Sequence, residues 1–191
     1  MTPNALTIFR LLLTPLILFL TYDATGPWRL TAALALFLLA LLTDWLDGHL
    51  ARSRGQITAF GTVMDPVADK ALMLGLMFVL AKLGVVQVWV VLVVLFRELL
   101  VSGVRQYKGA LGDLVGANWM GKTKFCMQAG VILLAYVDMI VRALGRELAG
   151  GVNVVHLAAA LMAIASLAFA LNFVRIQFFA HARRDEEPPP E

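Results

Sequence analysis

Four aspartates in two closely spaced pairs are the residues of this sequence best suited to chemistry. They are Asp44, Asp47, Asp65 and Asp69. All four lie at membrane-proximal positions, where a charge costs roughly 2.5 kcal/mol or more and is normally kept for function. Residues three or four positions apart share one face of a helix, so each pair presents two carboxylates in one direction. Two such pairs on neighbouring antiparallel helices can converge on one point.

Converging carboxylates repel one another strongly unless cations neutralise them. Oxygen ligands select hard metal ions, so four acids suit two divalent ions, Mg²⁺ first, with Mn²⁺ or Ca²⁺ as alternatives. Two-metal sites serve phosphoryl chemistry, and we expect such a site here. The alternative interpretation is that the acids are helix-end residues paired with the neighbouring cations Arg52, Arg54 and Lys70.

Small residues and an arginine accompany the acids. Gly48 and Ala51 fall within about 40° of the first aspartate on a helix, which leaves room for a bulky ligand. Arg52 lies one turn beyond Gly48, where its fork could bind a diphosphate. Gly61 stands one turn before the third aspartate and opens the facing helix. The alternative of paired helix-end acids does not account for this grouping.

The elements that must position these residues are apolar helices. The chain has 191 residues, of which 60% are hydrophobic and 15% charged. This excludes a disordered chain, a coiled coil and an ordinary soluble domain. We expect an all-α polytopic membrane protein with six transmembrane helices and no nucleic-acid partner. The apolar blocks lie at about residues 5–22, 29–50, 60–82, 85–107, 121–142 and 152–180.

The two ends of the chain and its single cysteine give three further predictions. The first block has features of a signal peptide, but no small-x-small cleavage site follows, so we expect it to be retained as a helix. We expect one membrane domain over residues 1–182 and a disordered tail over 183–191. The lone Cys126 excludes an intramolecular disulfide and a multi-cysteine metal site, and we expect a buried, inert thiol.

The distribution of Lys and Arg predicts the orientation. A cytoplasmic N-terminus places 12 of the 16 basic residues on the cytoplasmic side. We therefore expect both termini and the acid cluster to face the cytoplasm. The four remaining basic residues are Arg29, Lys82, Arg142 and Arg146.

The acidic region resembles the signature of the CDP-alcohol phosphotransferase family. It reads D-x-x-D-G-x-x-A-R, eight further residues, then G-x-x-x-D-x-x-x-D, from Asp44 to Asp69, without a departure in spacing or identity. The resemblance implies six membrane helices, a homodimer, and transfer of a phosphatidyl group from a CDP-alcohol to a second alcohol with release of CMP.

The resemblance also implies roles for individual residues. The first three aspartates would be metal ligands, and Asp69 would be both a ligand and the base for the acceptor hydroxyl. Gly48, Arg52 and Thr58 would contact the cytidine diphosphate, with Ala51 and Gly61 beside them. The N-terminal Asn4, Thr7 and Arg10 would line the nucleotide site, although interfacial anchoring accounts for them equally well.

Basic residues outside the signature suggest the acceptor. Glu98, Ser102 and Arg105 lie within about 60° of one another on a helix, and Lys122 and Lys124 open the next helix. Cations at these helix ends suit a phosphorylated acceptor. The competing explanation is that basic residues at cytoplasmic helix ends reflect topology and anionic lipid.

The runs R-E-x-x-x-S-x-x-R and G-K-x-K-x-x-x-Q look like those of the family branch that makes phosphatidylglycerophosphate. That branch uses CDP-diacylglycerol and glycerol 3-phosphate in the inner (cytoplasmic) membrane of bacteria, with the active site facing the cytoplasm. Two alternatives stay open. The acceptor could be inositol phosphate, or the acids could serve a divalent-cation carrier, although the later sequence has no matching second acid cluster.

Overall fold

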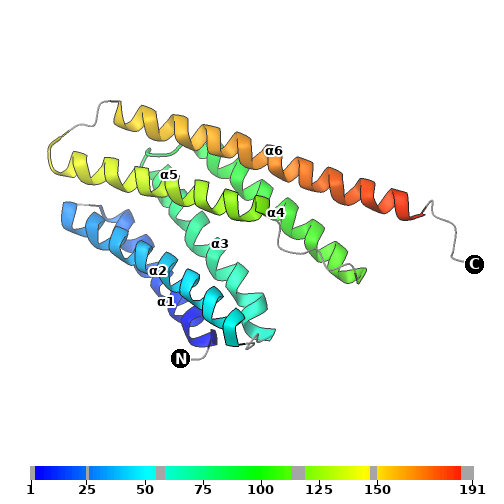
Figure 1. Cartoon of the computed structure of the whole chain (residues 1–191). Helices are drawn as coiled ribbons and strands as arrows, with labels where there is room; N and C mark the ends of the chain where they lie inside the picture. Colours follow the sequence, from blue (N-terminus) through cyan, green and yellow to red (C-terminus); the bar gives the residue numbers. More distant parts are fainter. Residues whose placement is uncertain (1–2, 25, 55–58, 113–118, 147–149, 186–191) are drawn as a thin grey trace, which may run out of the picture.

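The computed structural model is all-helical in the part of the chain that it describes, residues 3–24, 26–54, 59–112, 119–146 and 150–185. Side chains are described throughout this part except at 3–7, 44–54, 59–63, 65, 119–122 and 178–185. Figure 1 shows the helices in chain order, which are α1 (Pro3–Tyr22), α2 (Pro27–Arg54), α3 (Ala59–Lys82), α4 (Val88–Ala110), α5 (Trp119–Ala143) and α6 (Gly151–Asp185).

The prediction of an all-α chain with six apolar helices is confirmed, and the helix bounds lie within a few residues of the predicted blocks. Helix α6 continues to Asp185 and so includes the first residues of the stretch 183–191, which is expected to be a disordered tail. The limits of the domain and of the tail stay predictions. Residues 186–191 lie outside the described part.

Two helices of the described part contain segments long and apolar enough to cross a bilayer. They are Thr123–Ala143 in α5 and Gly151–Gln177 in α6. The apolar stretches Ile8–Tyr22 and Pro27–Thr43 are shorter. Six membrane crossings and the cytoplasmic placement of both termini therefore stay predictions.

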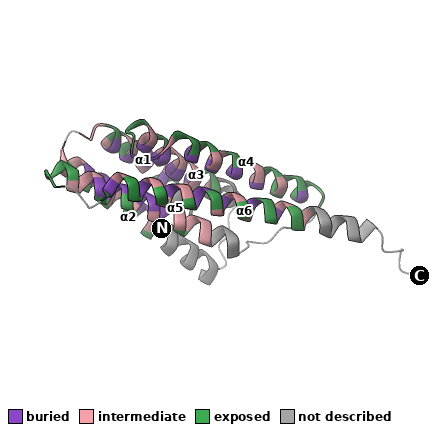
Figure 2. Ribbon diagram, turned by 90° about the horizontal axis from the view of Figure 1, so that it is seen from above, coloured by how far each residue is buried: buried purple, intermediate pink, exposed green. Residues whose placement is uncertain are grey.

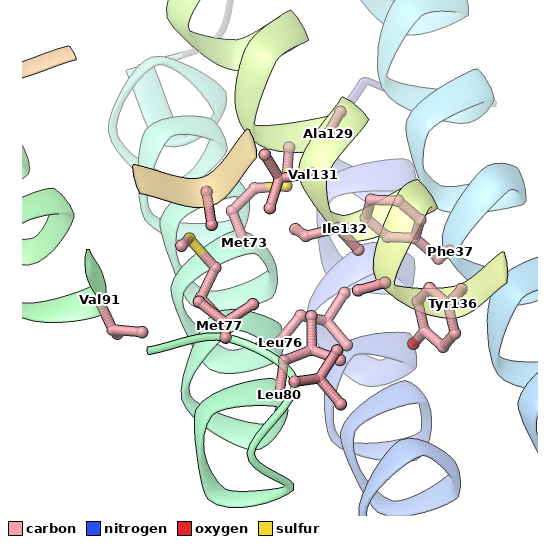
Figure 3. Close-up of a cluster of buried hydrophobic side chains, with 14 of the residues drawn as sticks. Phe37, Met73, Leu76, Met77, Leu80, Val91, Ala129, Val131, Ile132 and Tyr136 are labelled. Carbon is pink, nitrogen blue, oxygen red and sulfur yellow. The ribbon is translucent and has the colours of Figure 1, made fainter. Parts of the chain in front are cut away.

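The centre of the bundle is α3, which packs against α1, α4 and α5. Figure 3 shows Leu76, Met77 and Leu80 of this helix facing Ile132 and Tyr136 of α5, and all five side chains are fully buried. The Tyr136 ring lies near Phe37 of α2, with 6.2 Å between the ring centroids, and the Tyr136 hydroxyl bonds to the Thr21 hydroxyl of α1 at 2.6 Å. These contacts join four helices into one core.

The outward faces of the helices are apolar as well. Large side chains such as Leu12, Phe96 and Leu157 are exposed on three different helices, and Figure 2 shows exposed residues alternating with buried ones along each helix. Cys126 lies on an outward face, so the expectation of a buried thiol is wrong. It stands two positions before the buried Gln128, and two helical residues point about 200° apart.

Successive helices reverse direction along the chain (Figure 1). The first half of α3, the second half of α4 and the first turns of α5 therefore come together at one end of the bundle. Asp69, Glu98 and Lys124 belong to these three segments. The topology thus gathers at one end the charged residues that the sequence separates.

Candidate functional site

A pocket of about 320 Å³ opens between α3, α4 and α5 at this end of the bundle. Its size is that of a small-molecule site. Its apolar lining residues are Pro66, Met73, Leu74, Val101 and Phe125. The charged and polar lining residues are Asp69, Lys70, Arg97, Glu98, Ser102, Arg105, Lys124 and Gln128. Four cations against two carboxylates leave the described lining with a net positive charge, which favours an anionic ligand.

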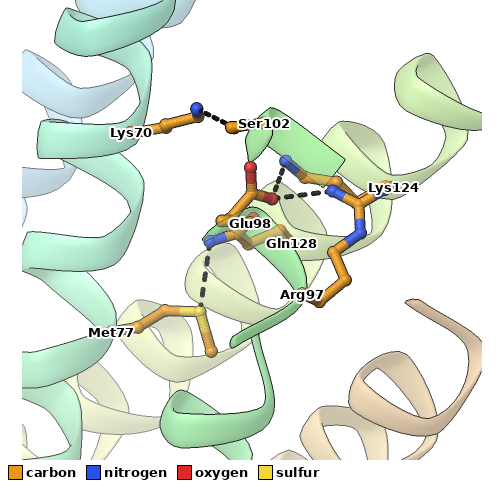
Figure 4. Close-up of polar contacts among 7 residues, drawn as sticks. All are labelled: Lys70, Met77, Arg97, Glu98, Ser102, Lys124 and Gln128. Carbon is orange, nitrogen blue, oxygen red and sulfur yellow. Dashed lines mark hydrogen bonds and ion pairs between the residues drawn. The ribbon is translucent and has the colours of Figure 1, made fainter. Parts of the chain in front are cut away.

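A buried ion cluster forms one side of the pocket (Figure 4). Arg97 Nη1 donates to Glu98 Oε1 at 2.8 Å, and Lys124 Nζ donates to the same oxygen. The Arg97 and Glu98 side chains are only 6% and 8% exposed. Adjacent opposite charges inside an apolar helix, such as Arg97 and Glu98, are consistent from sequence alone with either an internal ion pair or a ligand-binding role. In the structure they form the ion pair and also line the pocket.

Two further contacts hold cations at the pocket. Lys70 of α3 donates a hydrogen bond to the hydroxyl of Ser102 on α4, which ties these helices together. The Arg105 guanidinium carbon lies 5.8 Å from the centroid of the Phe173 ring on α6, within the range of a cation–π contact. The Phe173 ring thus orients the guanidinium of Arg105, whose hydrogen-bond donors can still bind an anion in the pocket.

Asp69, the last residue of the acidic signature, lines the pocket. Its Oδ1 accepts a hydrogen bond from Arg10 Nη1 of α1 at 2.7 Å. The Asp69 side chain is 34% exposed, whereas that of Arg10 is buried. A carboxylate has lone pairs for several partners, so the arginine can orient Asp69 while other lone pairs face a metal ion or a hydroxyl group.

The structure brings three of the predicted site residues together, because Asp69, Arg105 and Lys124 line the same pocket. Of the other predicted residues, Thr58 lies outside the described part. Others have a described backbone, but their side chains are not described. They are Asp44, Asp47, Gly48, Ala51 and Arg52 of α2, Gly61 and Asp65 of α3, Asn4 and Thr7 of α1, and Lys122 of α5.

The predicted metal ligands occupy the two helix segments on either side of one short connection. The first two aspartates lie in the last turns of α2, and Asp65 and Asp69 lie in the first turns of α3. Among the side chains that are described, no group of three His, Cys, Asp or Glu occurs, since only Asp69 of the four is in that set. Its exposed carboxylate beside a pocket fits a hard divalent ion.

Sequence reasoning missed the place of Lys70 in the pocket and the pairing of Arg10 with Asp69. From the sequence, Lys70 is a cytoplasmic basic residue or an ion-pair partner of the aspartates, and it directly follows the last signature aspartate. An ionisable residue inside an apolar helix is a functional candidate by default, and that rule could have identified Lys70. The Arg10 contact joins residues 59 positions apart, which no local pattern reveals.

A protein-family model described as CDP-alcohol phosphatidyltransferase matches residues 1–174 of this chain. The match covers every element that contributes to the pocket. The family expected from the aspartate signature is therefore confirmed.

Curated relatives are similar over most of the chain. A Pseudomonas fluorescens protein is 40% identical over 141 residues (70% of this chain, 71% of the relative). A Cereibacter sphaeroides protein is 36% identical over 138 residues (71% and 62%), and a Bacillus subtilis protein is 33% identical over 133 residues (64% and 69%). Each is named CDP-diacylglycerol–glycerol-3-phosphate 3-phosphatidyltransferase. The match spans less than two thirds of the Cereibacter protein.

The ion cluster gives a stability prediction. Glu98→Ala leaves Arg97 and Lys124 buried without their shared carboxylate, so we expect a loss of about 3–5 kcal/mol in the free energy of unfolding. The matched control is Asp23→Asn, which breaks an exposed ion pair with Arg29 and should cost about 0–1 kcal/mol. Thermal unfolding in detergent measures both, and equal losses in the two variants would contradict this assignment.

Proposed function

Because the chain belongs to the CDP-alcohol phosphatidyltransferase family, we propose that it transfers the phosphatidyl group of CDP-diacylglycerol to glycerol 3-phosphate. The products are phosphatidylglycerophosphate and CMP. The observation that carries the proposal is the pocket in which Asp69 shares one space with Lys70, Arg105 and Lys124. A base beside a group of cations suits an acceptor that carries both a hydroxyl and a phosphate.

The family membership favours a transferase over a divalent-cation carrier. The choice of glycerol 3-phosphate over other phosphorylated acceptors draws on the names of the relatives. Inositol phosphate would also suit a cationic pocket, and an acceptor screen therefore decides between them.

The donor set proposed for the metal is Asp44, Asp47, Asp65 and Asp69, and it suits two Mg²⁺ ions, with Mn²⁺ as the alternative. When bound there, such ions would supply positive charge for the diphosphate and for the charge that develops on the departing CMP. The nucleotide contacts proposed with them are Gly48, Ala51, Arg52, Thr58, Gly61, Asn4 and Thr7.

The described side chains act on the acceptor. Arg105 and Lys124, with Lys122 as a further candidate, hold its phosphate and so orient its free primary hydroxyl toward Asp69. Asp69 takes the proton of that hydroxyl while the hydroxyl oxygen bonds to the phosphorus of the phosphatidyl group. The bond from this phosphorus to the CMP oxygen breaks at the same centre, and CMP leaves. Arg10 keeps the Asp69 carboxylate in place.

We further propose that all six helices cross the inner (cytoplasmic) membrane of a bacterium, with both termini and the site on the cytoplasmic side. The apolar outer faces support this, as do the exposed aromatic residues Tyr22, Trp28 and Trp89 at the end of the bundle opposite the pocket, where an interfacial belt would lie. A homodimer is expected from the family resemblance alone.

The first prediction from this proposal concerns the acceptor. Purified protein in detergent should release CMP from CDP-diacylglycerol only when a divalent metal ion and glycerol 3-phosphate are both present. Chelation of the metal should abolish release. Equal release with inositol phosphate, or none with either acceptor, would refute the assignment of the acceptor.

The second prediction concerns the base. Asp69→Asn keeps the size of the side chain but removes its basicity, so we expect turnover to fall by about 10²-fold or more with the protein still folded and inserted. The control is Asp138→Asn, which changes a buried carboxylate of α5 at the opposite end of the bundle and should leave catalysis in the folded fraction near wild type. Full activity in Asp69→Asn would remove this residue as the base.

A further inference from the structure

Glu98 carries a carboxylate oxygen that the ion cluster does not use. Both of its contacts fall on Oε1, which accepts from Arg97 and from Lys124. Figure 4 shows its other oxygen turned away from these two cations, on the side of Ser102 in this view. The side chain is only 8% exposed and lines the pocket. Among the described side chains, Oε2 has no partner.

The Glu98 side chain is mostly buried and lines the pocket, so an oxygen that takes no donor from the protein offers an acceptor position to a donor on the ligand. The phosphate of an acceptor cannot fill this role, because it is itself an anion. The reacting hydroxyl is directed to Asp69. The remaining donor on a polyol phosphate is a hydroxyl that does not react.

We propose that Glu98 Oε2 accepts a hydrogen bond from a non-reacting hydroxyl of the acceptor and thereby selects polyol phosphates. This inference rests on the function proposed above. The role is one of specificity, because the carboxylate touches the substrate without taking part in the transfer of the phosphatidyl group.

The spacing along α4 fits such an acceptor. Glu98, Ser102 and Arg105 lie on one face of the helix and all line the pocket. Glu98 and Arg105 are seven residues apart, which is about 10 Å along the helix axis. A phosphate near Arg105 therefore leaves room for the carbon chain and its hydroxyl toward Glu98.

Hydroxyl recognition of this kind predicts strong discrimination. A bound acceptor that lacks the hydroxyl covers this charged oxygen without giving it a donor, and such a site rejects that acceptor more strongly than a site that is merely shaped for the hydroxyl. Because Arg97 and Lys124 already hold Oε1 in place, little conformational entropy of the Glu98 side chain is lost when the acceptor binds.

The test compares glycerol 3-phosphate with 3-hydroxypropyl phosphate, which has the same chain without the secondary hydroxyl. For the wild-type protein we expect kcat/KM for glycerol 3-phosphate to be about tenfold to hundredfold higher. In Glu98→Gln the oxygen is replaced by a neutral group, and this ratio should fall to about a tenth of the wild-type value. Glu98→Asp keeps the charge for Arg97 and Lys124 but withdraws the carboxylate, and it should also lower the ratio.

The matched control is Arg105→Gln, which removes a cation proposed to hold the phosphate but leaves Glu98 with both partners of its Oε1. It should lower kcat/KM for both acceptors and leave their ratio within about twofold of wild type, because both acceptors carry the phosphate. A wild-type protein that uses the two acceptors equally, or Glu98 variants that keep the full ratio, would overturn the inference alone. Absence of turnover with glycerol 3-phosphate would overturn the proposed function as well.

Discussion

Burying charge in an apolar helical bundle costs several kcal/mol per ion unless an opposite charge and hydrogen bonds compensate for it, and this constraint governs the functional end of the molecule. The buried charges at this end of the bundle have specific partners. Glu98 Oε1 accepts from Arg97 of α4 and Lys124 of α5, and the buried Arg10 of α1 donates to Asp69. The exposed Arg105 lies over the Phe173 ring of α6. The same contacts that pair the charges also fix the positions of the helices, so the site and the bundle depend on one another.

The pocket owes its chemistry to the topology. Helices α3 and α5 begin at this end of the bundle, and α4 ends there. Residues from three separate stretches of sequence therefore line one pocket. Asp69 is the link between the two halves of the proposed active site, because it ends the acidic signature and also lines the cationic pocket. A phosphorylated acceptor held by Arg105 and Lys124 is thereby brought beside the carboxylate that is proposed to activate its hydroxyl.

Helices and the acidic signature could be predicted from the sequence because both are local. The apolar blocks give the bounds of α1 to α6 to within a few residues, apart from the end of α6 at Asp185. Contacts between distant segments could not be predicted. The pairing of Arg10 with Asp69 and the sharing of one Glu98 oxygen by Arg97 and Lys124 depend on how helices are rotated about their axes. A weak apolar periodicity does not determine that rotation, which is also why Cys126 was placed on the wrong face.

In the proposed active site the acid cluster and the cationic pocket form one site, in which bound metal and acceptor phosphate lie close together. The ³¹P relaxation of glycerol 3-phosphate in the presence of the Mn²⁺-loaded protein measures this closeness. We expect strong paramagnetic enhancement in the wild type, lost in Asp65→Asn because the metal is not held and in Arg105→Gln because the phosphate is not held. Binding of both Mn²⁺ and glycerol 3-phosphate without any enhancement would put the two ligands in separate sites and rule out a shared one.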